Sequence, residues 1–181
     1  VQTCALPILS ANFFGKLYNE NKTFCLKLFK HYIFSLGKML KELGININTI
    51  PVLDILRNNT NRVIGNRSFS KDKKIVKELG NLAVKCLHSN KISGVIKHIP
   101  GHGPSVSDSH KKLPRISFKL KKLNEIDFYP FKQSKAKFAM TAHILYSRLD
   151  NKYPATHSKK IIKNIIRKKL KFRGILISDD I

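Results

Sequence analysis

Residues 94–110 (GVIKHIPGHGPSVSDSH) bring one lysine, three histidines and one aspartate into a single short stretch of the chain. An apolar run over 94–99 comes first. Pro100 then removes a backbone donor, and Gly101 and Gly103 allow backbone angles that other residues avoid, so the run must end in a loop. Ionisable side chains on a loop that directly follows a buried strand are typical of a site that binds or transforms a ligand.

One chemistry to consider for this loop is metal binding. His98 and His102 have the spacing of a helical zinc-binding pair, and His110 could add a third ligand. Pro100 and Gly101 lie between the first two histidines and disfavour the helix that such a pair needs. No cysteine is near them in the sequence. We therefore predict no metal site and no cofactor.

A second set of chemical groups lies at the end of the chain, where Asp179 and Asp180 follow the apolar run 174–178. Two carboxylates at the end of a buried strand are rarely structural, because burying an unpaired charge is costly. Magnesium-dependent phosphoryl chemistry would use such a pair, although the sequence has no GxxxxGK[ST] phosphate loop. The alternative is a single carboxylate nucleophile beside a basic loop that holds a sugar.

The elements that must position these residues alternate along the chain. Apolar periodicity predicts helices over 21–43, from Ser70 to about residue 87, and from Ser158 to about residue 170. Strands are predicted over 45–54, 94–99, 138–146 and 174–180. Apolar strands that alternate with helices indicate a parallel α/β fold. Each predicted strand has polar residues at or near its end: Asp54, Lys97 with His98, His143, and Asp179 with Asp180. A barrel of βα units builds its active site at that end of its strands.

The charge of the chain suggests other functions. Its 35 Lys and Arg against 11 Asp and Glu give a net charge of +24, as expected of a protein that binds nucleic acid or a lipid surface. The lysines are spread over the whole chain, however, and the isoleucines of 158–173 form the narrow stripe of a helix packed on a sheet. No apolar stretch reaches the roughly 18 residues of a membrane span. We expect no nucleic-acid and no membrane partner.

Three cysteines without CxxC spacing fit a reducing compartment, so we expect a cytoplasmic protein.

Several motifs in order resemble one family. KHIPGHG followed by DSH, then MTAHILY, YPATHS and FRGILISDD, resemble glycoside hydrolase family 3, in its bacterial β-N-acetylhexosaminidase branch that acts in peptidoglycan recycling. GININTIPVLDI and VIGNRSFS fit the same family upstream, so the resemblance runs from about residue 20 to the end. Residues 165–179, with Arg167, Lys169, Gly174 and Ser178 at the expected spacing, resemble its active-site signature. The fold implied is a (β/α)8 TIM-type barrel, only partly covered by this chain.

The resemblance also implies roles. The enzyme would be a retaining β-N-acetylhexosaminidase that removes terminal N-acetylglucosamine from peptidoglycan fragments. Asp179 would be the nucleophile that forms a glycosyl-enzyme intermediate, with Asp180 in support. His110 paired with Asp108 would be the acid/base, which suits an imidazole that titrates near neutral pH. Sugar binding is implied for Arg67, Lys97 and His98.

The chain also departs from the family. Pro104-Ser105 stands where many relatives have Asp-Thr, and no segment resembles the upstream DQEGGRV strand. A full barrel needs eight strands and about 250 residues, so we expect this chain to be a fragment. Residues 9–181 would be a partial catalytic barrel that is inactive alone. Residues 1–8 (VQTCALPI) are expected to be non-native, adapter-like sequence. The full-length protein is expected to be a monomer. Two alternatives stay open: another family 3 glycosidase such as a β-glucosidase, or a basic nucleic-acid-binding protein.

Overall fold

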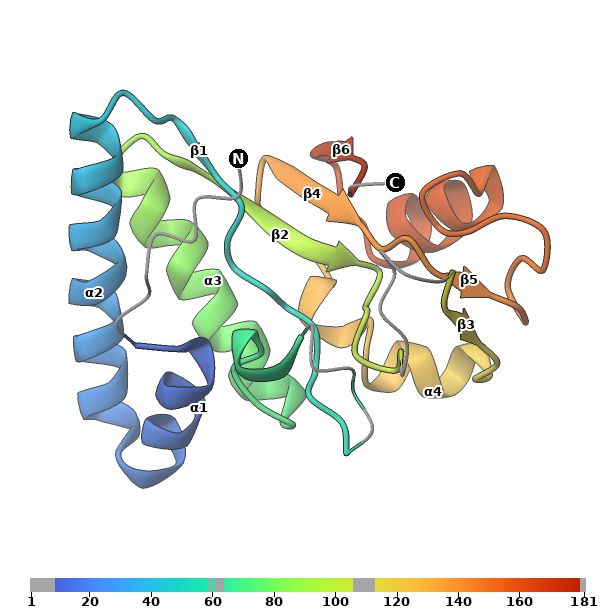
Figure 1. Ribbon diagram of the computed structural model, residues 1–181, viewed down its shortest axis with the longest axis horizontal. Coiled ribbons are helices and arrows are strands. Elements are labelled where there is room, and N and C mark those ends of the chain that lie inside the picture. The colour runs from blue at the N-terminus through green and yellow to red at the C-terminus, as the bar shows by residue number, and fades with distance from the viewer. Residues whose placement is uncertain (1–8, 59, 61–63, 106–112, 180–181) are drawn as a thin grey trace.

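A parallel four-stranded sheet forms the centre of the computed structural model, which describes residues 9–58, 60, 64–105 and 113–179. Its strands are β1 (Ile47–Asn48), β2 (Ser93–Ile99), β4 (Phe138–Thr141) and β6 (Ile175–Ile177), in the order β1-β2-β4-β6 (Figure 1). All three neighbouring pairs are parallel. The order in the sheet follows the order in the chain, as in a barrel of βα units, whereas a doubly wound sheet reverses direction. The predicted α/β class is confirmed.

Helices connect the strands of this sheet. α3 (Lys73–Ser89) lies between β1 and β2 and packs against β2. Between β2 and β4 come α4 (Leu120–Glu125) and the short turn η2 (Tyr129–Phe131), and η3 (Ile161–Lys169) precedes β6. α3 begins later than predicted, because the Asp72 carboxylate accepts the N–H of Lys74 and caps it, while Ser70 Oγ accepts the N–H of Asp72. The apolar stripe predicted for this helix is buried, apart from Leu82, which is partly buried.

An outer layer of two helices covers α3 (Figure 1). α2 (Lys22–Glu42) packs against α3, and α1 (Ala11–Glu20) packs against α2. The helix predicted over 21–43 is confirmed, and Gly44 follows its last turn with a φ of 76°, which glycine adopts without strain. α1 was not predicted. Its Phe14 ring is buried 4.7 Å from that of Phe29 and joins the continuous apolar core.

Two predicted strands are shorter than expected. In the segment 45–54 the regular ladder is limited to β1, and the Ile50–Pro51 peptide is cis. The segment nevertheless continues along β2, where Val52 bridges Lys97 and the N–H of Leu53 donates to the carbonyl of Lys97. The strand predicted over 138–146 is two strands. β4 ends at Thr141, and β5 (Leu145–Tyr146) pairs instead with β3 (Arg115–Ile116).

The helix predicted from Ser158 is confirmed in its start and its packing face. Ser158 Oγ accepts the N–H of Ile161, and three isoleucines of η3 are buried. η3 is a π-helix, in which hydrogen bonds join residues five positions apart. The same spacing is seen just after its end, where the N–H of Leu170 donates to the carbonyl of Ile165. Burial of this stripe in the apolar core favours a helix packed inside the fold over one that binds nucleic acid or a membrane surface. Among the described residues, no helix combines the length and the apolar character that crossing a membrane requires.

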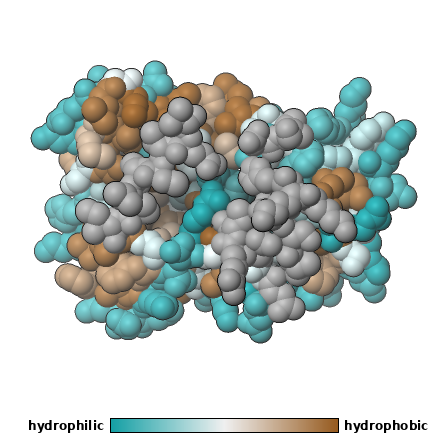
Figure 2. Space-filling view, in the orientation of Figure 1, coloured by the Kyte–Doolittle hydropathy of each residue, from teal (hydrophilic) through white to brown (hydrophobic). Residues whose placement is uncertain are grey.

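The surface carries apolar and basic groups in separate places. Leu43 and Ile45, between α2 and β1, and Ile47 on β1 are exposed. Figure 2 shows a brown, apolar region at the upper left, where Figure 1 draws the end of α2 and β1. Three lysine ammonium groups lie 5.1 to 5.7 Å from the centre of the Tyr129 ring, those of Lys73, Lys77 and Lys132. We call these three residues the Tyr129 lysine cluster. Burial and then the neighbouring lysines, Lys169 included, lower the pKa of Lys132.

Candidate active site

The carboxyl ends of the strands bring together an imidazole and two carboxylates. His98, on β2, lies between Asp54, which follows β1, and Asp179, which follows β6. Its Nδ1 atom is 2.6 Å from Asp54 Oδ2, and its Nε2 atom is 3.5 Å from Asp179 Oδ2. The prediction that the strand ends gather the polar residues is confirmed for these three. From the sequence, Asp54 is recognisable only as a polar strand end, with no role indicated.

Asp54 is fully buried and accepts several hydrogen bonds. Beside His98 Nδ1, its carboxylate accepts the backbone N–H of His98 at 3.2 and 3.3 Å and the backbone N–H of His102 at 2.6 Å. Burial by itself would raise the pKa of Asp54, but the charge and hydrogen bond of His98, with further help from His102, bring that pKa below its ordinary value. The carboxylate is therefore ionised at neutral pH.

Lys97 is buried next to His98 at the same strand end. The side chain of Lys97 is 7% exposed, and burial, followed by the charge of Arg67, lowers its pKa to about 8 against the opposing pull of Asp179 and Asp54. Two consecutive residues of a regular strand point to opposite faces. Here Lys97 pairs with Met140 and Ile99 with Thr141, so His98 is an extra residue in the ladder and the alternation is broken. The peptide between Lys97 and His98 is cis.

The remaining predicted site residues fall into two groups. Arg67 ends the turn η1 (Gly65–Arg67), is half-buried, and lies close enough to Lys97 for its charge to lower the pKa of that lysine. It therefore joins the site where it was expected. The predicted acid/base residues His110 and Asp108 lie outside the described residues, as does Asp180. Their roles stay predictions.

Two more histidines lie near the site. His102 is 2% exposed, its ring is 5.4 Å from that of His98, and burial lowers its pKa. His143 follows β4, with its ring 5.9 Å from that of His157; burial, then His157, lowers the pKa of His143, while Asp179 raises it. Within the part of the chain that the structure describes, no three histidine, cysteine or acidic side chains are arranged to hold a metal ion.

Supporting contacts that the sequence did not indicate hold the loop after β2. The guanidinium of Arg57 forms a two-point ion pair with Asp127, whose side chain is 1% exposed. The hydroxyl of Tyr146 donates to the carbonyl of Gly101 at 2.7 Å. Gly103 lies so close to the preceding strand end that an added Cβ would be 2.2 Å from the carbonyl oxygen of Ile55. None of these pairs follows a local pattern, because their members are far apart in the chain.

Arg167 belongs to the signature-like stretch but lies at the other end of β6 from Asp179. Its Nη1 atom donates to the carbonyls of Phe172 at 3.1 Å and Gly174 at 2.7 Å. Both carbonyls precede the strand. Arg167 therefore anchors the entry of β6.

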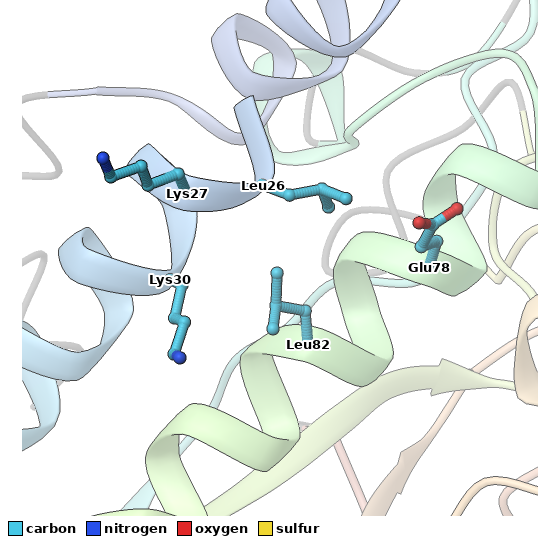
Figure 3. Close-up of a pocket in the computed structure, with 5 residues that line it drawn as sticks. All are labelled: Leu26, Lys27, Lys30, Glu78 and Leu82. Atoms are coloured by element: carbon cyan, nitrogen blue, oxygen red, sulfur yellow. The ribbon is translucent and has the colours of Figure 1, made fainter. Parts of the chain in front are cut away.

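A separate hollow lies between the outer helix α2 and helix α3, away from the strand ends. Leu26, Lys27 and Lys30 of α2 and Glu78 and Leu82 of α3 line it (Figure 3). Leu26 and Leu82 point into the space between the helices, while Lys27 points away. Glu78, its acidic group, is engaged by the hydroxyl of Tyr18 and the ammonium of Lys22. The residues that line the hollow include no imidazole and a single carboxylate, which is already engaged, whereas the strand ends bring an imidazole and two carboxylates together; the strand ends are therefore the candidate active site.

Known proteins similar to this chain were found by sequence and by structure. Beta-hexosaminidase A of Pseudoalteromonas piscicida is 38% identical over 160 residues, which are 80% of this chain and 27% of that protein. A beta-hexosaminidase of Stenotrophomonas maltophilia (strain K279a) is 33% identical over 170 residues, 92% of this chain and 50% of that protein. The crystal structure of native NagZ from Neisseria gonorrhoeae matches with a TM-score of 0.88 and 30% identity, covering 94% of this chain and 50% of that one.

The chain thus spans half or less of the length of these relatives. The family described as the glycosyl hydrolase family 3 N terminal domain matches residues 19–181. This match includes every described residue of the candidate site and almost the whole chain. The sheet order, the strand-end site and the match agree, and the chain belongs to glycosyl hydrolase family 3.

Proposed function

We propose that the full-length protein is a retaining β-N-acetylhexosaminidase, which removes terminal β-linked N-acetylglucosamine from peptidoglycan fragments. The observation that carries the proposal is the position of Asp179, a carboxylate at a strand end with His98 Nε2 3.5 Å away and the buried ammonium of Lys97 near it. Relatives named beta-hexosaminidases at 33% and 38% identity support the sugar specificity.

The reaction proceeds in two displacements. Asp179 attacks the anomeric carbon as the bond to the leaving oxygen breaks, and that oxygen takes a proton from the acid/base, for which the resemblance gives His110 with Asp108. Water then attacks the same carbon, gives a proton back to the acid/base and releases Asp179. Two inversions retain the configuration of the sugar.

Lys97, His98 and Arg67 bind the sugar in this proposal. Their donors suit hydroxyl groups and the acetamido carbonyl, which accept hydrogen bonds. Buried donors discriminate strongly, because a ligand that lacks the matching acceptor leaves them unpaired. This supports selectivity for the acetamido sugar over plain glucose.

The test uses the complete reading frame that contains this chain. Hydrolysis of an aryl β-N-acetylglucosaminide is compared with that of the matching aryl β-glucoside, and the mass of the intact protein is measured after reaction with a slow fluorinated N-acetylglucosaminide. We expect selective cleavage of the acetamido sugar and a covalent adduct on the unmodified protein. Asp179→Ala should form no adduct and lose activity, and His110→Ala should be strongly slowed.

Two exposed residues on the outer helices provide matched controls, Glu20→Ala for the carboxylate and His31→Ala for the imidazole. Both should keep full activity. Preferential cleavage of the glucoside would move the protein to the β-glucosidase alternative. Unchanged activity in Asp179→Ala would remove the nucleophile from the proposal.

We further propose that the protein works in the cytoplasm as a monomer. Cys25 and Cys86 support the reducing compartment, since both are free thiols buried in the core, where burial raises the pKa of each. Fractionation of cells that express a tagged full-length protein, followed by sizing of the soluble fraction by light scattering, tests both statements. A periplasmic or dimeric product would contradict them.

A further inference from the structure

The hydrogen bonds around Asp54 dictate where a proton sits on His98. The Oδ2 atom of Asp54 is 2.6 Å from His98 Nδ1, and its Oδ1 atom accepts the N–H of His102 at 2.6 Å. The N–H of His98 lies between the two oxygens at 3.2 and 3.3 Å. An ionised carboxylate can only accept hydrogen bonds. A contact of 2.6 Å therefore requires a proton on His98 Nδ1.

The same contacts fix the orientation of the imidazole. Asp54 binds both the backbone and the ring of His98, and the side chains of the two residues are 0% and 6% exposed, so water cannot replace either partner. With Nδ1 committed to Asp54, Nε2 is the ring atom that faces Asp179. Nε2 is then the only ring nitrogen of His98 that can meet a ligand at the strand ends.

We propose that Asp54 is a positioning residue, which holds His98 in the Nδ1–H form and presents Nε2 to Asp179 and to the bound sugar. Its consequence for catalysis rests on the proposed function, whereas its consequence for the protonation of His98 does not. When neutral, His98 accepts a hydrogen bond from a sugar hydroxyl through Nε2. When protonated, it donates through the same atom.

A single isosteric substitution distinguishes this arrangement from a merely structural one. In Asp54→Asn, the backbone N–H of His102 is a fixed donor and requires the amide oxygen at the position of Oδ1. The amide NH2 group then takes the position of Oδ2 and points at His98 Nδ1. Because NH2 is a donor, Nδ1 must become an acceptor and the proton of the neutral ring moves to Nε2. The equivalent exchange in a Ser-His-Asp triad also produces the wrong tautomer.

The matched control is Asp127→Asn. Asp127 is also a buried carboxylate, with a side chain 1% exposed, and it pairs with Arg57 rather than with a histidine. The exchange there removes the same charge from a similar depth and leaves the partners of His98 intact. Any effect common to both variants reflects loss of a buried charge, and any effect of Asp54→Asn alone reflects the positioning of His98.

The experiment is 15N NMR of the full-length protein with labelled histidine, recorded between about pH 5 and pH 9. The signals of His98 are assigned by their loss in His98→Gln. We expect Nδ1 to stay protonated over the whole range in the unmodified protein and in Asp127→Asn. In Asp54→Asn we expect the proton of the neutral His98 ring on Nε2. Kinetics on the aryl N-acetylglucosaminide should show kcat/KM lowered about 10- to 100-fold in Asp54→Asn beyond the effect of Asp127→Asn.

The outcomes separate the two proposals. An unprotonated Nδ1 in the neutral ring of the unmodified protein overturns the positioning role, and this spectrum decides the matter even if Asp54→Asn does not fold. An unchanged tautomer in a folded Asp54→Asn, or a kcat/KM equal to that of Asp127→Asn, also overturns it. If the expected tautomers appear but no N-acetylglucosaminide is cleaved, the arrangement of His98 stands and the proposed function fails.

Discussion

Replacing Lys97 with methionine should stabilise the protein at neutral pH, although it removes a residue of the candidate site. Burial and the charge of Arg67 lower the pKa of Lys97 from 10.5 to about 8. This difference corresponds to about 3 kcal/mol by which the fold disfavours the ammonium. Methionine has a similar shape without the charge, so we expect the free energy of unfolding to rise by about 1 to 3 kcal/mol at pH 7.

The dependence on pH provides a stricter test. Below pH 8 the lysine is protonated in both the folded and the unfolded protein, and the full penalty applies. Between pH 8 and 10.5 the folded protein holds fewer protons than the unfolded one, so the contribution of Lys97 to stability rises with pH. The advantage of Lys97→Met should therefore shrink as the pH increases and be nearly absent above about pH 10.5.

Urea unfolding followed by circular dichroism, at about pH 7, 9 and 10.5, measures this difference. Lys163→Met, at an exposed lysine of η3, is the matched control and should change stability by less than about 0.5 kcal/mol at each pH. Lower stability of Lys97→Met at pH 7 would refute the reasoning. An advantage that stays constant up to pH 10.5 would refute it equally, since the gain would then come from packing.

Three further predictions concern the supports of the site and the surface. Arg57→Met should lower the free energy of unfolding by about 3 kcal/mol at neutral pH, because it leaves Asp127 buried without its partner; urea titration should show a smaller loss at acidic pH, where the carboxyl is protonated. Gly103→Ala should cost about 1 to 3 kcal/mol in thermal or urea unfolding, because its Cβ would overlap the carbonyl of Ile55, and wild-type stability would contradict that contact. Added salt should raise the melting temperature by screening the net charge of +24, and substituting one lysine of the Tyr129 lysine cluster by methionine should weaken this salt response.

The parts of the fold that local periodicity controls could be predicted from the sequence. The helix over 21–43 was correct because its stripe of apolar residues every three or four positions is long and ends at Gly44. The meeting of His98 with Asp179 was also expected, since the carboxyl ends of parallel strands share one edge of a sheet. Sugar-binding and catalytic roles came from the resemblance and not from these patterns.

The features that were missed depend on contacts between distant segments. Arg57 and Asp127 are 70 positions apart and neither lies in a periodic stretch. The extra residue in the ladder at His98 leaves no mark in the sequence, because it is defined only by the pairing of β2 with β4. Residues 142–144 separate β4 from β5 although the whole segment is apolar enough for one strand. Tertiary pairing decided each of these.

The hydrogen bond from Arg167 at the start of β6 helps to determine where Asp179 lies at the end of that strand. Arg167 holds the carbonyl of Gly174, and Asp179 stands five residues further on, a span of about 16 Å in an extended chain. If β6 slipped along β4 by two residues, its side chains would keep their faces but Asp179 would move by about 7 Å, out of contact with His98. A residue remote from the chemistry thus sets the registration of the carboxylate, and a defect there would look, in kinetic data alone, like the loss of Asp179 itself.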